Sequence, residues 1–183
     1  RYIVTPEINP EYQWVFDDQA VRATEKLDGT NISLVIEDGI IKSVWNRKNR
    51  IQILVGDWRV NEGIIMAIKR KYLPSFDGQH FGELVGPEVN GNSLKLDRHL
   101  WVPLTYIHSN YAYTSWGKYP KTFEAISDWF RKDIFSLFMR KWHNETTFPE
   151  GVVFVQPSTG KMAKLRRDMF DWYSGKEHED EKK

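Results

Sequence analysis

Residues 23–31, with the sequence Ala-Thr-Glu-Lys-Leu-Asp-Gly-Thr-Asn, join two runs that are typical of β-strands. The first run covers residues 21–26 and the second covers residues 31–37. Lys26, Asp28 and Gly29 form the pattern K-x-D-G between them. A lysine at a strand end, beside a Gly-Thr-Asn turn, is suited to be a nucleophile that faces phosphate. Because chance supplies this four-residue pattern in roughly one chain in twenty of this length, its meaning depends on the remaining sequence.

The composition is that of a globular protein. The 183 residues suit one domain with a proper core, and the 40% hydrophobic and 14% aromatic content argues against disorder. The chain shows neither a signal-peptide pattern nor an apolar run that could cross a bilayer, and it has no cysteine for disulfides or thiolate metal sites. We therefore expect a cytoplasmic protein without membrane association. Because its net charge is only +1, binding of nucleic acid would require a local basic face.

The first half of the chain reads as a hairpin-rich sheet with one helix. Alternating aromatic residues predict a short strand over residues 12–16. Asp38-Gly39 predicts a hairpin that returns along residues 40–45. Asp57 is a suitable N-cap for a helix over about residues 58–72, which residues 79–85 follow as a strand.

The second half predicts further strands and a long helix. Residues 100–107 read as one or two strands broken at Pro103, and residues 108–121 read as a loop. Thr122 can cap a helix that reaches about residue 141. Residues 150–155 and 161–166 predict a second hairpin, so the fold class is α+β with antiparallel sheets. We expect one domain over residues 1–175 and a charged flexible tail over residues 176–183.

Charged residues gather at the predicted strand ends and turns. Each group alone fits an ordinary solvated turn or strand edge, and their order along the chain gives them meaning. The groups are Lys26 with Asp28, Arg47 with Arg50, Glu83, Glu150, and Lys164 with Arg166.

This order resembles the nucleotidyltransferase motifs of ATP-dependent polynucleotide ligases and mRNA-capping enzymes. The resemblance covers residues 20–172, and Glu-Lys-x-x-Gly-Thr-Asn at residues 25–31 is most similar to RNA-editing-type RNA ligases. The loop Gly86-Pro87-x-x-x-Gly91-Asn92 is similar to that of phage-encoded RNA ligases. The motifs are residues 25–31 (I), Arg47 (Ia), residues 81–84 (III), residues 150–154 (IV) and residues 161–166 (V).

The resemblance implies both a fold and a reaction. The fold would be two antiparallel sheets flanked by helices, with a nucleotide cleft between them and no C-terminal barrel domain. Lys26 would attack the α-phosphate of ATP to form a covalent lysyl-AMP. The AMP would pass to a nucleic-acid 5′-phosphate, which a 3′-OH then attacks to seal the strand. RNA is the favoured substrate, and the expected protein is a monomer in the cytoplasm or, if phage-encoded, in the host cytoplasm.

The resemblance also implies a role for each site residue. A free lysine is mostly an ammonium at neutral pH, so nearby cations such as Lys164 and Arg166 would help to activate Lys26. Glu150 would bind Mg²⁺ or Mn²⁺, and Lys164 would bind the α-phosphate. The expected nucleotide contacts of the remaining residues are Glu25 to the adenine amine, Asn31 to the ribose or the substrate end, Glu83 to the ribose hydroxyls, and Arg47, or alternatively Arg50, to phosphate.

Two features depart from the family pattern. Relatives usually carry a lysine where this chain has Arg166, which keeps the charge but has a forked geometry. The aromatic residue that stacks on adenine could be Trp101 or Tyr106, and either could instead belong to the core.

Three alternatives to an RNA ligase remain open in the sequence. A DNA ligase and a GTP-dependent capping enzyme use the same motifs. A catalytically silent nucleic-acid-binding relative is the third, although the intact Lys26, Glu83, Glu150 and Lys164 argue against it. Because only 17 residues follow Arg166, we expect self-adenylylation to be retained and sealing to be weak if a further domain is needed.

Overall fold

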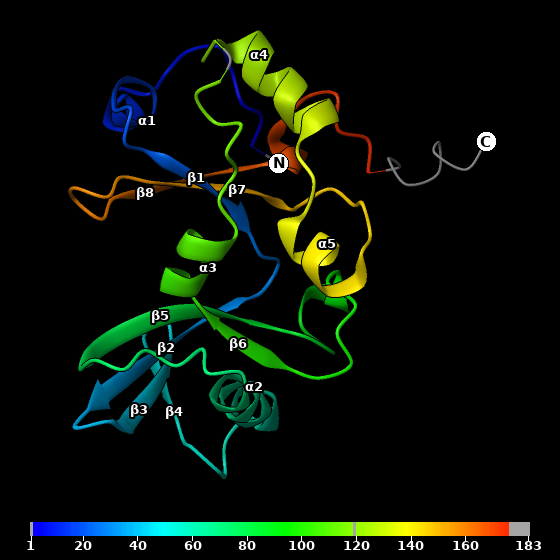
Figure 1. Ribbon diagram of the computed structural model, residues 1–183. Helices are drawn as coiled ribbons and strands as arrows, with labels where there is room; N and C mark the ends of the chain where they lie inside the picture. Colours follow the sequence, from blue (N-terminus) through cyan, green and yellow to red (C-terminus); the bar gives the residue numbers. More distant parts are fainter. Residues whose placement is uncertain (1, 119, 176–183) are drawn as a thin grey trace. The chain divides into compact units, whose positions relative to one another are not determined.

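Two antiparallel sheets confirm the expected α+β architecture (Figure 1). The computed structural model describes residues 2–118 and 120–175, so the tail expected at residues 176–183 lies outside the described residues. The three-stranded sheet has the order β1-β7-β8, formed by Arg22–Lys26, Gly151–Val155 and Met162–Arg166. The five-stranded sheet has the order β4-β3-β2-β5-β6, formed by Asn49–Ile51, Ile40–Asn46, Thr30–Glu37, Gly78–Val85 and Leu100–Pro103.

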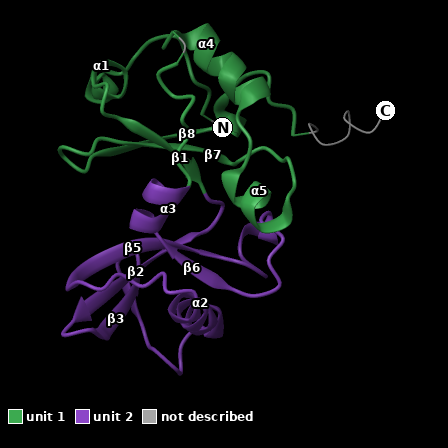
Figure 2. Ribbon diagram, in the orientation of Figure 1, with its two compact units in different colours: residues 1–26, 111–183 green, residues 27–110 purple. Residues whose placement is uncertain are grey.

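The chain divides into two compact units, and each contains one sheet (Figure 2). Unit 1 comprises the chain up to Lys26 and from Tyr111 onward, and unit 2 comprises Leu27–Asn110. The helical segments of unit 1 are η1 (Pro10–Tyr12), α1 (Trp14–Asp17), α4 (Phe123–Asp128), the π-helical η3 (Trp129–Asp133), α5 (Leu137–His143) and η4 (Arg167–Met169). Those of unit 2 are α2 (Trp58–Lys69), η2 (Asn90–Asn92) and α3 (Leu104–Asn110). No helix in the described ranges is long and apolar enough to span a membrane.

The strand expected over residues 12–16 is wrong, because this segment is helical. The Asn9 side chain accepts a hydrogen bond from the Glu11 N–H, and Pro10 occupies the start of η1. An N-cap followed by proline favours a helical turn. α1 then buries only Val15, so this local capping outweighs the alternating aromatic pattern.

Two other segments differ from the prediction. β6 ends at Pro103 and α3 follows directly, so residues 104–107 are not a strand and residues 108–110 of the predicted loop are helical. The long helix expected from Thr122 is interrupted, because Ile134 has extended backbone angles and Ser136 caps a new helix, α5. The Ser136 hydroxyl accepts from the Met139 N–H, a capping bond that favours a fresh helix start.

Each unit has its own apolar core. In unit 1 the core lies between the three-stranded sheet and the α4–η3 segment, and it includes Ala23, Trp129, Phe130, Val152 and Phe154. In unit 2 the helix α2 packs on one face of the five-stranded sheet, with Val60, Ile64, Ala67, Leu34 and Trp101 in the core.

Because Gly82 on β5 has no side chain, the indole ring of Trp101 can pack directly over this strand. A Cβ atom at Gly82 would lie 2.5 Å from Cε2 and 2.6 Å from Nε1 of the Trp101 indole. The indole is fully buried and donates a hydrogen bond of 3.0 Å to the Ile32 carbonyl. The glycine of motif III is therefore required by packing in unit 2.

We predict that Gly82→Ala lowers the free energy of unfolding by about 1–3 kcal/mol, because the new methyl group displaces the Trp101 indole from a packed core. Urea denaturation followed by tryptophan fluorescence measures this change. Glu37→Ala, at the exposed end of β2, is the matched control and should change stability by less than about 0.5 kcal/mol. Equal stability of Gly82→Ala and the wild type would contradict the packing role.

Candidate active site

The register of the three-stranded sheet places three cationic side chains on one face. Across the sheet, Lys26 pairs with Gly151, and Gly151 pairs with Arg166. Two residues along the strands, Thr24 pairs with Val153, and Val153 pairs with Lys164. Directly paired residues share a face, and residues two apart along a strand share it as well. Lys26, Lys164 and Arg166 therefore lie on the same face, which is suited to attract phosphate.

Gly151 brings the strands of this face close together. A Cβ atom at this position would overlap the Leu165 carbonyl oxygen and lie 2.8 Å from the Cα of Arg166. Because Gly151 stands between Lys26 and Arg166 in the sheet, any side chain there would both displace β8 and separate these two cations. The glycine of motif IV thus has a steric role at the centre of the face.

Lys26 forms an ion pair with Glu150. Its Nζ lies 2.6 Å from Oε2 of Glu150, and the two side chains are 20% and 24% exposed, so both remain accessible to a ligand. Glu150 directly precedes β7, and its carbonyl accepts a hydrogen bond of 3.0 Å from the Arg167 N–H. The Arg167 guanidinium is buried, donates to the Phe130 carbonyl and lies 3.7 Å from the centre of the Phe148 ring. Arg167, which the sequence did not single out, anchors the backbone that presents Glu150.

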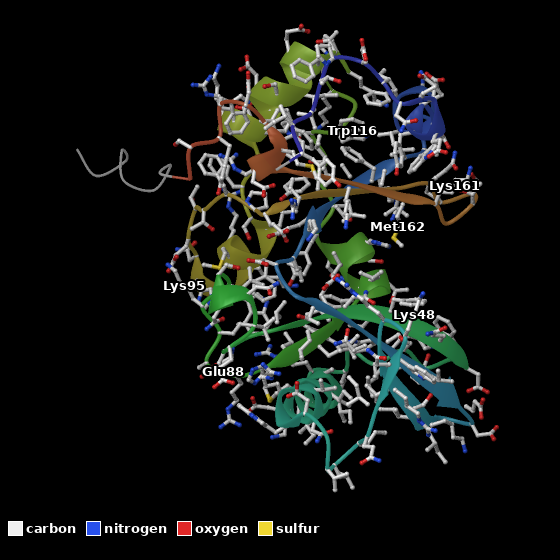
Figure 3. All side chains as sticks on the ribbon, turned by 180° about the vertical axis from the view of Figure 1, so that it is seen from behind. Lys48, Glu88, Lys95, Trp116, Lys161 and Met162 are labelled. Atoms are coloured by element: carbon white, nitrogen blue, oxygen red, sulfur yellow. The ribbon has the colours of Figure 1, made fainter. Side chains whose placement is uncertain are left out.

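Asp28 is held by the loop that follows β5. Its Oδ1 accepts 2.9 Å from the Asn90 amide, which also donates to the Gly29 carbonyl, and its Oδ2 accepts 3.0 Å from the Ser93 hydroxyl. Glu88 and Lys95 belong to the same loop (Figure 3). We call the contacts of Asn90 and Ser93 with Asp28 the Asp28 clamp. The acidic residue of motif I therefore fixes a turn in unit 2.

A buried histidine fixes the other end of this loop. The two ring nitrogens of His99 face Oε2 of Glu62, at 2.7 Å, and the Pro87 carbonyl. The His99 N–H also donates to the Glu62 carboxylate. Because Glu62 lies on α2, the loop carrying Asn90 and Ser93 is attached to the core helix of unit 2.

Asn31 and Glu83 are direct cross-strand partners on β2 and β5. They lie on the sheet face opposite α2, because the alternating neighbours Ile32 and Leu84 point into the core. The Asn31 amide donates a hydrogen bond of 3.4 Å to the Gly82 carbonyl. Asn31, expected to contact the ribose or the substrate end, and Glu83, expected to contact the ribose hydroxyls, therefore lie side by side in unit 2.

The two candidate arginines occupy different positions in the β3–β4 hairpin. Arg47 is in its turn with a φ of 53°, and Arg50 pairs with Trp45 on β3. Lys48 is the neighbouring turn residue (Figure 3). Since Trp45 pairs with Ser33, two residues after Asn31, Arg50 shares the sheet face of Asn31 and Glu83. The strand register therefore supports Arg50 as the candidate for the phosphate contact more strongly than motif order alone does.

Glu25 does not fit the role expected from the resemblance. Next to Lys26 in a strand, its side chain points to the opposite face, where it is 1% exposed. Its carboxylate accepts 2.5 Å from the Ser136 hydroxyl and 2.9 Å from the Phe138 N–H, at the start of α5. Burial raises the pKa of Glu25 to about 7, although the hydrogen bonds from Ser136 and Phe138 oppose this rise. The side chain therefore joins β1 to α5 and is not placed to contact adenine.

The structure excludes one of the two aromatic residues considered for stacking on adenine. Trp101 is fully buried in the unit 2 core and cannot offer a ring face to a nucleotide. On β6 the residue that pairs with Glu83 is Val102, which is not aromatic. Tyr106, on α3, packs against Tyr72 with ring centroids 4.1 Å apart. Successive side chains of β6 point to opposite faces of the sheet. Because Val102 pairs with Glu83, the neighbouring Trp101 must point into the core, and this alternation would have excluded it.

A divalent metal at Glu150 fits only if other ligands come from outside the protein. Among residues 2–118 and 120–175 no group of three or more His, Asp or Glu side chains is placed to hold a metal. Mg²⁺ commonly binds one or two carboxylates and completes its shell with water and phosphate oxygens. A single accessible carboxylate beside a phosphate-binding face is compatible with that pattern.

The fold is similar to that of solved RNA ligase structures from Naegleria gruberi. An apo lysine-to-alanine mutant gives a TM-score of 0.55 at 17% identity over 85% of this chain. A glutamate-to-alanine mutant with ATP and Mn gives 0.56 at 16% identity over 91%, and a complex with pyrophosphate gives 0.56 at 15% over 92%. This chain spans 52–56% of the length of those ligase chains. No protein-family model and no curated protein sequence matches it significantly.

We predict that Glu25 makes stability pH-dependent. With a folded-state pKa of about 7 against an ordinary value of 4.5, the folded state keeps a proton that the unfolded state loses between these pH values. The stability gained from this proton is complete below pH 4.5 and is lost as the pH rises through 7. Glu25→Gln cannot lose a proton, so its stability relative to the wild type should increase with pH by on the order of 3 kcal/mol.

Urea unfolding of both proteins at pH 5 to 8 measures this difference. Glu124→Gln, on the exposed side of α4, is the matched control and should show a constant difference from the wild type. A constant difference for Glu25→Gln as well would contradict a raised pKa of Glu25.

Proposed function

We propose that this chain is an ATP-dependent RNA ligase, or its adenylyltransferase part, that forms a covalent lysyl-AMP. The observation that carries the proposal is the Lys26–Glu150 pair on a face that also bears Lys164 and Arg166. A nucleophilic amine, a carboxylate for a metal and two phosphate-binding cations are the groups that attack at a nucleotide phosphate requires. The fold shared with RNA ligase structures and the motif order of the sequence support the same activity.

The first step transfers AMP to Lys26. The ion pair with Glu150 must open, and the ammonium must release a proton to solvent water, before Nζ has a free electron pair. Nζ then attacks the α-phosphorus of ATP, so that an N–P bond forms while the bond from the α-phosphorus to the bridging oxygen breaks and pyrophosphate leaves. Lys164 and Arg166 stabilise the negative charge on the phosphate oxygens during this transfer.

Glu150 is the proposed protein ligand of Mg²⁺ or Mn²⁺. A bound divalent cation neutralises phosphate charge and polarises the α-phosphate. The same carboxylate holds Lys26 in the ligand-free protein, so occupation by a metal would compete with the ion pair. Glu150 thus holds the nucleophile at rest and the metal in the reactive complex.

The face of unit 2 with Asn31 and Glu83 is the proposed ribose-recognition surface. A carboxylate can accept from two neighbouring ribose hydroxyls, which is the role proposed for Glu83. Arg47 or Arg50 would bind a phosphate of the nucleotide or substrate. The bound AMP would then pass to an RNA 5′-phosphate, and a 3′-OH would displace it to seal the strand.

We expect α-labelled ATP with Mg²⁺ to label the wild-type protein and not Lys26→Ala, because that variant lacks the amine that forms the N–P bond. Gel electrophoresis of the denatured protein measures the label. Lys132→Ala, which removes an exposed lysine from η3 outside all of the motifs, is the matched control and should label normally.

Other results of the same experiment would overturn parts of the proposal. Label from GTP alone would indicate a capping-type enzyme, and no label from either nucleotide would indicate a catalytically silent relative. Adenylylation followed by sealing of nicked DNA but not RNA would indicate a DNA ligase.

The Asp28 clamp should also influence the rate of adenylylation. Asn90→Gly with Ser93→Ala removes both donors, and glycine accommodates the φ of 45° at position 90. We expect self-adenylylation to slow by roughly ten-fold, because the turn after Lys26 loses its fixed position and small misplacements of reacting groups are costly. Single-turnover labelling measures the rate. Added to Asp28→Ala, Ser93→Ala should have no further effect, because the Ser93 hydroxyl donates to the Asp28 carboxylate, and an additive loss would contradict the clamp.

A further inference from the structure

A row of four paired residues crosses the face of the five-stranded sheet opposite α2. Arg50 pairs with Trp45, Trp45 with Ser33, and Ser33 with Phe81, so the four residues lie side by side on β4, β3, β2 and β5. We call these four residues the aromatic row. Because paired residues share a face, the row lies on the face opposite α2, two positions along β2 and β5 from Asn31 and Glu83.

Phe81 presents a large apolar side chain to solvent. Its side chain is 47% exposed, although β5 is an inner strand of the sheet. The reason is that β6 ends at Pro103, opposite Gly82 and one residue short of Phe81. The unit 2 core does not require this exposed ring, because that core lies on the other face of the sheet.

Hydrogen bonds hold Trp45 and Ser33 of the row in place. The Trp45 indole N–H donates 2.8 Å to the Ser43 hydroxyl, and the Gln79 amide donates 3.0 Å to the Ser33 hydroxyl. Strands lie about 4.8 Å apart, so Trp45 and Phe81, two strands apart, stand roughly 10 Å from each other. This separation leaves room for two different bases.

The charge next to the row matches a nucleic-acid backbone. Residues 46–50, Asn-Arg-Lys-Asn-Arg, place three cations and no carboxylate in the β3–β4 hairpin. Fixed aromatic rings beside cations are how proteins bind single strands without reading their sequence, through base stacking and phosphate contacts.

We propose that the aromatic row binds an unpaired stretch of the nucleic-acid substrate, with bases stacked on Phe81 and Trp45 and phosphates held by the β3–β4 hairpin. This inference rests on the proposed function for its biological substrate, but the binding itself is measured separately from adenylylation. Continuity with the Asn31–Glu83 pair places the bound strand beside the proposed ribose-recognition surface of the same unit.

Fluorescence anisotropy with a short fluorescein-labelled oligouridylate tests the proposal. Phe81→Leu keeps an apolar side chain but removes the ring, and it should weaken binding about ten-fold, whereas Phe81→Tyr should bind as the wild type does. Ile65→Ala removes a similarly exposed apolar side chain from α2, on the opposite side of the sheet, and should leave binding unchanged. An oligonucleotide with abasic sugars should bind the wild type and Phe81→Leu equally.

Salt dependence separates stacking from phosphate contacts. The slope of log K against log salt is about −0.7 for each phosphate contact to a single strand. Arg50→Gln should make the slope less steep by about 0.7, and Phe81→Leu should leave it unchanged. Thermal unfolding of each variant identifies any loss of fold, in which case Phe81→Met provides the second ring-free variant.

Each outcome decides the proposal without reference to ligase activity. Equal affinity of Phe81→Leu and the wild type, or no binding of RNA or DNA single strands by the wild type, would overturn it. Weakened binding by Phe81→Leu in a protein that fails to label with ATP would support the aromatic row and refute the proposed function. Preference for RNA over DNA of the same length would identify the polymer.

Discussion

The close approach of β7 and β8 at Gly151 is the constraint on which the arrangement of unit 1 depends. With no Cβ there, the Leu165 carbonyl lies directly against the strand, and Lys26 and Arg166 flank a residue without a side chain. Glu150, one residue earlier, is then presented to Lys26 while its carbonyl is fixed by the Arg167 N–H. The ion pair and the cationic face therefore lie beside one close backbone contact that tolerates no side chain.

In unit 2 a tightly turned loop fixes the position of Asp28. The left-handed residues Asn90, Gly91 and Asn92 turn the chain tightly, and this turn brings an amide to Asp28. Asparagine and glycine tolerate such angles better than other residues do. The same loop is also held by His99, whose ring contacts the Pro87 carbonyl and Glu62 on α2. The loop therefore connects Asp28 to the core helix of unit 2.

The sequence predicts the strands and hairpins well because their signals are local. Asp38-Gly39, the alternation of residues 31–37 and the apolar run after Glu150 each describe an element within a few residues. The break before α5 could not be predicted in this way, since Ser136 is fixed by Glu25, 111 residues earlier. The Asp28 clamp and the steric role of Gly151 likewise depend on partners distant in sequence. The orientation of Glu25 was predictable, because a residue next to Lys26 in a strand must face the other side. Motif order proposes the candidate site residues, and strand register shows which of them share a face.

Placing Lys26 and Glu25 next to each other on one strand has a consequence for how such a chain can change over time. Lys26 is partly exposed on the cationic face, and Glu25 is buried at the start of α5. Inserting or deleting one residue within β1 would exchange the two faces, burying the amine and exposing the carboxylate. Substitutions can therefore accumulate around this strand, but its length cannot drift by a single residue. Related chains should differ in the lengths of their loops and keep the count of residues in β1 constant.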